Sequence, residues 1–148
     1  MREAIGGTWL FGLVITFIVF FASFLAVSIN YAKAFNVKNE VINIVSKYEG
    51  NNGNSRNAIR EYLRYQGYMV TGTCPSDYTG YDLSLDGNKV TQGKSYFCIK
   101  SESSSNNAVD KKYYSVIVFF KIDLPIVGRL TNFQIKGETE AIYFPVDK

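Results

Sequence analysis

The dominant pattern in this chain is an uninterrupted apolar run near its start. No charged side chain occurs from Thr8 to Ile29. At about 1.5 Å of rise per residue, a helix of roughly 22 residues is about 33 Å long, enough to cross a hydrocarbon core of about 30 Å. The pattern therefore predicts a short N-terminal head and a transmembrane helix over residues 1–29.

The helical pattern continues beyond the apolar run. Between Tyr31 and Tyr48, apolar residues recur mainly at spacings of three and four, and polar residues fall mostly on the other side. Neither Gly nor Pro occurs between Leu13 and Tyr48. One continuous helix is expected, apolar all round in its first half and amphipathic over residues 30–48.

A second, shorter helix is expected after the breaker cluster Gly50–Asn54. Asn54 or Ser55 would cap a helix over residues 55–66, and Gly67 would end it. Three arginines recur at every fourth position of this helix and form one basic face, which is either simply solvated or contacts a partner or lipid. These arginines are Arg56, Arg60 and Arg64.

The rest of the chain predicts β-structure, with strands within residues 68–144. The short candidates are Tyr68–Cys74, Tyr81–Leu85, Lys89–Thr91 and Ser95–Ser101. The turn Asp86–Asn88 would join the second of these to the third. Glu102–Asn107 is so polar that it is expected to be a loop.

Two long runs near the C-terminus alternate apolar and polar residues, Tyr113–Leu124 and Thr131–Phe144. This alternation predicts a hairpin with one buried face, to which Tyr143 would belong. Gly137 would mark a bulge or the close approach of a helix. Because the apolar face of the hairpin and the apolar stripe of the amphipathic helix must both be buried, we predict an α+β fold. In it a long N-terminal helix, half transmembrane and half amphipathic, packs on an antiparallel β-sheet in one domain of residues 30–148.

The distribution of charge indicates which partners the domain binds and on which side of the membrane it lies. The net charge is +3, and the positive excess lies between Lys33 and Arg64, without the dense basic module of a nucleic-acid-binding protein. Membrane lipid is the expected partner, and the apolar run exceeds the usual length of a signal peptide core, so a retained anchor is expected. Lysines after the helix would place the domain in the cytoplasm by the positive-inside rule. The cysteines and the Tyr/Asn/Ser/Gly-rich composition favour a cytoplasmic N-terminus and an extracytoplasmic domain instead.

The inventory of reactive residues argues against an enzyme. The chain has no histidine, Gly-rich phosphate loop or nucleophile elbow, so no catalytic residue, cofactor or metal is expected. Its two cysteines, Cys74 and Cys98, would form a disulfide in an oxidising compartment, worth roughly 3 kcal/mol by loop entropy. Two unrelated buried thiols are the alternative.

Two further features are candidates for contacts with other molecules. The hairpin connection Pro125–Leu130 is mostly aliphatic. Its residues Ile126 and Val127 either fold back onto the core or contact a neighbouring subunit or the membrane surface. Within the apolar helix, small residues would allow another helix to approach closely. These are Gly12, Ala22, Ser23, Ala26 and Ser28.

Taken together, the head Met1–Gly7, the apolar helix and the terminal hairpin YYSVIVFFKIDLPIVGRLTNFQIKGETEAIYF resemble type IV pilins and pseudopilins. The chain is more closely similar to TadE-like proteins, minor pilin-like components of tight-adherence pilus systems. In pilins a Gly precedes the cleavage site and a Glu occupies the fifth mature position. With Gly7 as the cleavage residue, that position here is Gly12, so the resemblance implies a minor or assembly-associated subunit.

The expected function is that of a non-enzymatic, membrane-anchored pilin-like subunit of a type IV or Tad-like pilus or secretion machine. Its partners would be other pilin-like subunits or platform proteins, and a surface pilus is one destination. The alternative is a membrane-anchored extracellular binding domain for a cell-wall polymer or peptide, unrelated to pili. Tyr78, Tyr81 and Tyr96 would then form the binding site.

Overall fold

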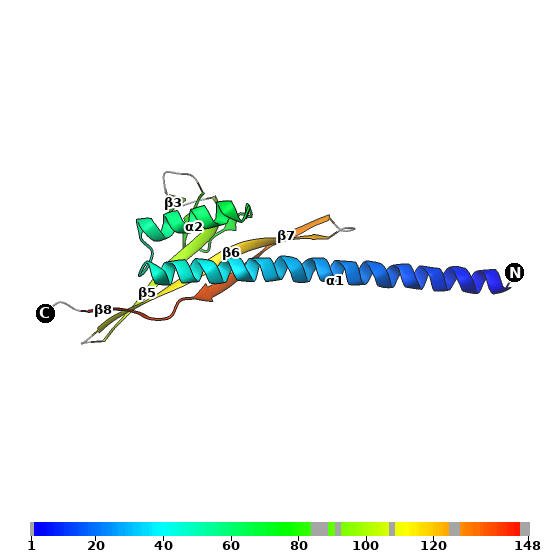
Figure 1. Ribbon diagram of the computed structural model, residues 1–148, viewed down its shortest axis with the longest axis horizontal. Helices are drawn as coiled ribbons and strands as arrows, with labels where there is room; N and C mark the ends of the chain where they lie inside the picture. The colour runs from blue at the N-terminus through cyan, green and yellow to red at the C-terminus, as the bar shows by residue number, and fades with distance from the viewer. Residues whose placement is uncertain (1, 84–88, 91–92, 107–108, 125–127, 146–148) are drawn as a thin grey trace.

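The computed structural model describes residues 2–83, 89–90, 93–106, 109–124 and 128–145 (Figure 1). Its longest element is the helix α1 (Arg2–Lys47), and an antiparallel sheet lies along the C-terminal part of that helix. The N-terminal part of α1 extends away from the sheet (Figure 1). The fold is therefore α+β, with a long N-terminal helix packed on an antiparallel sheet, as the sequence predicts.

α1 ends where the breaker cluster begins. Its last turn closes with hydrogen bonds from the Gly50 N–H to the Val45 carbonyl at 2.8 Å and from the Glu49 N–H to the Ser46 carbonyl at 3.1 Å. This is a Schellman arrangement, which places the residue after the cap in the left-handed region. That residue is Glu49, with φ of 55°, where glycine is the usual choice.

The second helix, α2 (Gly53–Tyr65), begins earlier than predicted. Asn52, not Asn54 or Ser55, is the N-cap, and it forms a capping box with Ser55. The Ser55 N–H donates to Asn52 Oδ1 at 2.9 Å, and the Asn52 N–H donates to Ser55 Oγ at 3.0 Å. Gly67 follows the helix with φ of 61°, which confirms its predicted role at the C-terminal end.

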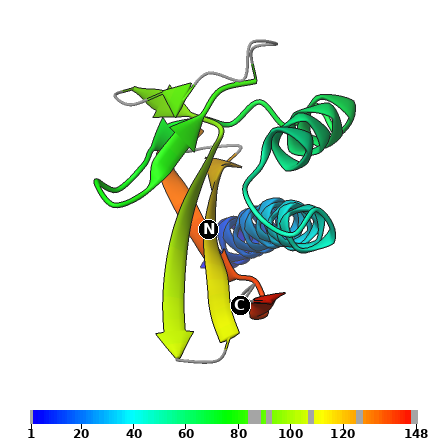
Figure 2. The ribbon, with the colours of Figure 1, turned by 90° about the vertical axis from the view of Figure 1, so that its left-hand side faces the viewer.

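The remaining elements are strands. Among the described residues, six strands form the main sheet, in the order β3-β2-β5-β6-β7 with β8 also paired to β6, while β1 and β4 form a separate pair. Both helices lie on the same side of the main sheet (Figure 2). The strands are β1 (Gly72–Thr73), β2 (Thr79–Tyr81), β3 (Lys89–Val90), β4 (Lys94–Ser95), β5 (Phe97–Asn106), β6 (Val109–Leu124), β7 (Gly128–Glu138) and β8 (Ile142–Pro145).

The main hydrophobic core lies between the helices and the sheet. The buried stripe of α1, which includes Val41 and Val45, packs in one cluster with Ile59 and Leu63 of α2 and with the inward residues of β5 and β6. A Cβ at Gly137 would lie 2.5 Å from the Ile42 Cδ1 atom, so the predicted close approach of a helix to this glycine is confirmed. The amphipathic half of α1 is thus the central support of the sheet domain.

Three sequence predictions about the sheet are wrong. Residues 102–106 are not a loop but the end of β5, because pairing with β6, from Glu102↔Tyr113 to Asn106↔Val109, outweighs their poor strand propensity. The strand expected over residues 131–144 is two strands, β7 and β8, interrupted at residues 139–141. Within residues 68–74, only Gly72–Thr73 is a strand.

The interruption between β7 and β8 has a specific cause. The Thr139 N–H donates to the Tyr114 carbonyl at 2.9 Å, and the Tyr114 N–H donates to Thr139 Oγ1 at 3.0 Å. A side-chain oxygen thereby replaces a backbone carbonyl in the ladder, and the register gains one residue. Ile142 then packs against the core and Tyr143 is 60% exposed, the reverse of the predicted alternation.

The second face of β6 is also buried in its central part, whereas the sequence predicted one buried face. Cys98, Ile117 and Phe119 form a cluster there, against which Val70 and Tyr78 pack. The Tyr68 hydroxyl donates to the Phe119 carbonyl. The segment between α2 and β2 therefore covers the sheet on the side away from the helices.

Candidate functional site

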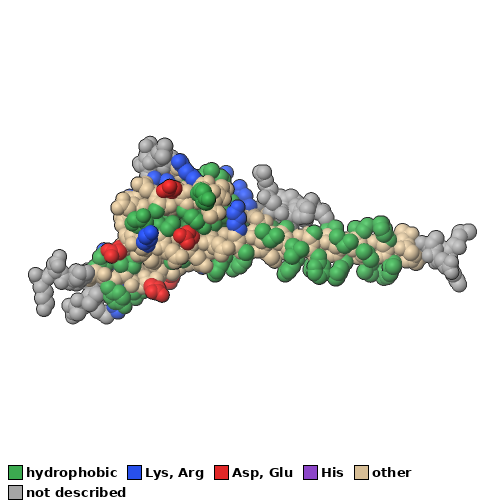
Figure 3. All heavy atoms as spheres, viewed as in Figure 1, with side chains coloured by type: hydrophobic (Ala, Val, Ile, Leu, Met, Phe, Trp, Pro, Cys, Tyr) green, Lys and Arg blue, Asp and Glu red, His purple; other side chains and the backbone are tan. Residues whose placement is uncertain are grey.

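The first candidate surface is the projecting half of α1. Its large apolar side chains are exposed along the whole projection, from Trp9 at 74% to Ile29 at 68% (Figure 3). Among the described residues, one helix is long and apolar enough to cross a membrane, and none of its most apolar stretch is buried. Apolar area on this scale is unfavourable in water, so lipid or other helices are its physical complement.

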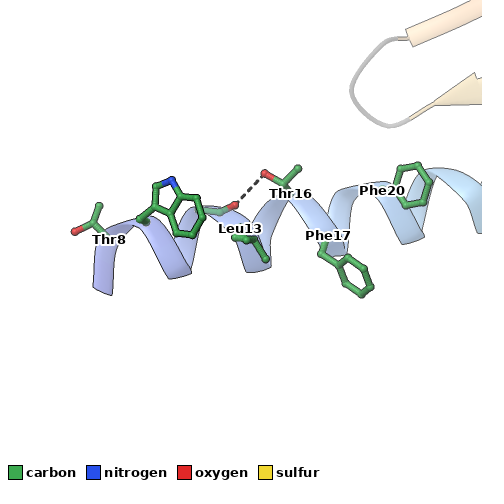
Figure 4. A pocket seen from close by; sticks show the side chains of 7 residues that line it. Thr8, Leu13, Thr16, Phe17 and Phe20 are labelled. Atoms are coloured by element: carbon green, nitrogen blue, oxygen red, sulfur yellow. Dashed lines mark hydrogen bonds between the residues drawn. The ribbon is translucent and has the colours of Figure 1, made fainter. Parts of the chain in front are cut away.

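The predicted small residues of α1 do not share one environment. Gly12 lies in a shallow apolar groove, and the Thr16 hydroxyl donates to its carbonyl at 2.9 Å (Figure 4). Ala22 and Ser28 are also exposed, whereas Ser23 and Ala26 are half-buried. The groove is lined by Thr8, Trp9, Gly12, Leu13, Thr16, Phe17 and Phe20.

The half-buried positions of α1 follow the face that the sheet covers. Val27 packs with Ala34, Phe120 and Ile122. Beyond Phe120, β6 continues to Leu124, so the strand extends about 13 Å further at 3.3 Å per residue. A helix covers the same distance with about nine residues. The end of the β6–β7 hairpin therefore runs alongside the apolar run itself, a feature that local periodicity does not reveal.

Ile126 and Val127, predicted to contact the core, a subunit or the membrane, lie outside the described residues. Their role stays a prediction. The strands on either side of them reach Leu124 and resume at Gly128, and these two residues are cross-strand partners.

The second candidate surface is the basic face of α2, whose three arginines have different surroundings. Arg56 Nη1 donates to the Asn51 carbonyl at 3.4 Å, and its guanidinium lies 5.6 Å from the centre of the Tyr81 ring. Arg64 Nη2 donates to the Leu83 carbonyl at 2.6 Å. Arg60, between them, is only 6% exposed. Of the two alternatives for this face, simple solvation does not describe Arg60, and contact with a partner or lipid stays a prediction.

The environment of Arg60 is electrostatically unusual. Burial, followed by the charges of Arg56 and Arg64, lowers the pKa of Arg60 below its ordinary value, and Asp82 opposes this shift. Arg60 Nη1 donates to Asn57 Oδ1 at 2.9 Å, but Arg60 Nε is buried and has no hydrogen-bond partner in the part of the chain that the structure describes. The guanidinium is held at one edge and unsatisfied at another.

On the opposite side of the sheet, the predicted disulfide is present. Cys74 and Cys98 are joined, with their Cα atoms 5.9 Å apart. The bond connects the segment after β1 to the second residue of β5. Gly80 lies beneath it, where an added Cβ would be 2.9 Å from Cys74 Sγ.

Charged side chains flank this disulfide and form a network on the same face. Lys100 Nζ contacts Asp77 Oδ2 at 2.9 Å and Glu102 Oε1 at 2.7 Å, and Lys136 Nζ contacts Glu138 Oε1 at 3.1 Å. Hydrogen bonding to Lys100 lowers the pKa of Asp77, and hydrogen bonding to Lys136 lowers the pKa of Glu138. Hydrogen bonding to the carboxylates of the network also raises the pKa of Lys100 and of Lys136, so Asp77, Glu138 and the two ammonium groups are stabilised in their charged forms, which suits a structural role.

The tyrosines proposed as an alternative binding site do not form an exposed platform. Tyr81 is 1% exposed, stacks on Phe97 at a centroid distance of 5.2 Å and accepts a hydrogen bond from Asn51 Nδ2 at 2.7 Å. Tyr78 and Tyr96 are half-buried and pack against different hydrophobic clusters, Tyr96 against the main core and Tyr78 against the cluster around Cys98. Among the described residues, no group of three or more His, Cys, Asp or Glu side chains is arranged to hold a metal ion.

The sequence predicted that Arg56, Arg60 and Arg64 share one face of α2, but it did not predict the cleft beside them. Asn57, Glu61 and Tyr65 line a cleft together with Arg60 and Arg64. Their spacings of three and four along α2 are visible in the sequence, whereas the burial of Arg60 depends on the tertiary fold.

No protein-family model, curated protein or solved structure matches this chain. The candidate surfaces therefore have to be interpreted from their own chemistry and geometry.

Proposed function

We propose that this chain is a non-enzymatic, membrane-anchored, pilin-like subunit, a minor or assembly-associated component of a type IV or Tad-like pilus or secretion machine. One observation carries the proposal. A single helix exposes an apolar half long enough to span a membrane and buries one face of its other half against an antiparallel sheet. This arrangement couples an anchor rigidly to a domain that is available for subunit contacts.

The same geometry supports lateral assembly through α1. Gly12 and the groove around it give a neighbouring helix room to approach, which favours packing between helices in lipid. The disulfide between Cys74 and Cys98 is typical of oxidising compartments, which supports an extracytoplasmic sheet domain and a cytoplasmic N-terminus. Membrane lipid, other pilin-like subunits and platform proteins are the partners of this proposal.

The test is to shear surface appendages from cells that express the chain and to identify it, with its N-terminal residue, by mass spectrometry. The proposal expects the chain in the appendage fraction or crosslinked to an assembly platform in the membrane. A mature start at Thr8 would indicate processing like that of a pilin. Recovery only as an isolated membrane protein, with no crosslinked partner, would contradict the proposal.

Substitutions in the apolar helix and in the hairpin connection sharpen this test. Gly12→Leu fills the groove and should reduce recovery in assemblies while the amount in the membrane is unchanged. Leu25→Ile is the matched control, because Leu25 is exposed and the change conserves volume. Replacing Ile126 and Val127 with Ser should abolish assembly with the domain folded if the hairpin contacts a partner, and should unfold the domain if it packs on the core.

A second candidate function is a membrane-anchored binding domain outside any pilus. The cleft beside the buried Arg60 favours it, whereas the buried Tyr81 does not support a binding site on the tyrosines. A gene neighbourhood that lacks a secretion ATPase and polytopic platform proteins would favour this second candidate over the first.

A further inference from the structure

The basic face of α2 contains a cleft that neither the anchor nor the sheet explains. The cleft has a volume of about 670 Å³ and is lined by Asn57, Arg60, Glu61, Arg64 and Tyr65. Asn57, Glu61, Arg64 and Tyr65 are exposed, and Arg60, which is 6% exposed, is the buried member of the lining.

The hydrogen bonds of Arg60 are incomplete. Its Nη1 atom donates to Asn57 Oδ1 at 2.9 Å, while its Nε atom is buried without a hydrogen-bond partner among the described residues. An unsatisfied buried donor is costly, and the cost is larger for a charged group than for a neutral one. In a guanidinium, the Nε–H and a neighbouring Nη–H lie in one plane and can donate together to two oxygens of one anion.

Within the described part of the chain, the positive charge around Arg60 is only weakly compensated. Among the residues that the structure describes, no carboxylate forms an ion pair within 4.0 Å of Arg56, Arg60 or Arg64, although Glu61 lines the cleft and Asp82 is close enough to act on Arg60. Three positive groups therefore act together with little local neutralisation. An anion would relieve both the repulsion among them and the unpaired donor.

The neighbouring arginines are fixed in place before any ligand arrives. Arg64 is held by the Leu83 carbonyl at 2.6 Å, and Arg56 is held over the Tyr81 ring and by the Asn51 carbonyl. Fixing long side chains in advance reduces the entropy that binding would cost. The arrangement is thus a preorganised cationic cleft and not a set of freely moving surface charges.

We infer that this cleft binds a phosphate group, with Arg60 as the donor at its floor and Arg64 as the donor at its rim. The inference does not rest on the proposed function. The phosphate could belong to a soluble or polymeric ligand or to an acidic lipid headgroup, since the recognising chemistry is the same.

The test uses the full chain, labelled with ¹⁵N and reconstituted in nanodiscs, and follows the arginine Nε–H resonances. The Arg60 signal is assigned by its loss in Arg60→Lys. One arm titrates inorganic phosphate in nanodiscs of phosphatidylcholine, and the other replaces part of that lipid with phosphatidylglycerol. Saturable movement of the Arg60 signal in the first arm indicates a soluble or polymeric phosphate, and movement in the second arm alone indicates a lipid headgroup.

Variants separate this site from general charge attraction. Arg64→Gln, followed by the Arg60 signal, should weaken binding roughly tenfold or more, the value of one charge-assisted hydrogen bond, and Arg60→Gln, followed by the Arg64 signal, should do the same. Lys33→Gln removes an exposed positive charge from α1 and should leave the affinity unchanged. Arg64 is exposed, so its variant keeps the test valid even where Arg60→Gln fails to fold.

Two results would overturn the inference. The first is an Arg60 signal that does not move in either arm, or that moves equally in wild type and Arg64→Gln. The second concerns Asp86, which follows Leu83 by three positions in the sequence. If Asp86→Asn shifts the Arg60 signal without any phosphate, and added phosphate has no further effect, a carboxylate of the chain itself occupies the cleft.

Discussion

The dependence of the sheet domain on α1 can be tested by truncating one side chain. Val41 is fully buried in the cluster that joins α1, α2 and the sheet. Val41→Ala removes two methyl groups, worth about 0.8 kcal/mol each in lost burial, and leaves a cavity in a closely packed core. We expect the free energy of unfolding of the sheet domain to fall by about 2–3 kcal/mol.

The assay is denaturant unfolding of the full chain in detergent micelles, followed by the near-ultraviolet circular dichroism of the domain tyrosines. Val14→Ala is the matched control, because it is the same substitution on the projecting half of α1, where Val14 is exposed. It should leave the midpoint unchanged. The reasoning fails if Val41→Ala lies within about 0.5 kcal/mol of wild type, the range of ordinary surface substitutions, or if Val14→Ala is equally destabilising.

Three further predictions concern separate parts of the fold. Glu49→Gly should stabilise the domain by about 1 kcal/mol, because φ of 55° costs a residue with a Cβ atom; an unchanged midpoint in the same assay would contradict this. The double variant Cys74→Ala, Cys98→Ala should lower the free energy of unfolding by about 3 kcal/mol, because the unfolded chain gains conformational entropy when the loop is open. Reduction of the wild-type disulfide should lower the midpoint similarly. A loss under about 1 kcal/mol would contradict the loop-entropy estimate. Asp77 and Glu138 have lowered pKa values in the folded state, so their contribution to stability is present above the pKa values of the unfolded chain and is lost as the pH falls through the pKa values of the folded state. A carboxyl NMR titration should show that Lys136→Gln raises the pKa of Glu138, and an unchanged pKa would refute that pairing.

Local patterns were sufficient to predict the principal elements. The helix followed from spacings of three and four without Gly or Pro, and β6 followed from a period of two that places an apolar residue at every second position. Gly67 and the Gly50 region were recognisable because helix ends favour residues that tolerate positive φ. Each of these features is encoded within a few neighbouring positions.

The features that sequence reasoning missed depend on distant partners. Thr139 interrupts the last strand only because its hydroxyl pairs with the Tyr114 N–H, 25 positions away. The polar end of β5 is a strand because β6 extends beside it. Arg60 repeats at the same spacing as Arg56 and Arg64, so only the tertiary fold reveals that it is buried and unsatisfied.

The central claim is that one unbroken helix joins the membrane to the sheet domain. The most direct measurement is the distance between spin labels on cysteines introduced at Thr16 and Ser46, by double electron–electron resonance on the full chain in nanodiscs. Both positions are exposed, and the native cysteines are joined to each other. A continuous helix predicts a narrow distribution centred at about 45 Å, from 1.5 Å per residue. A broad distribution or a clearly shorter distance would show that the helix bends or breaks where it leaves the membrane, and would contradict the account.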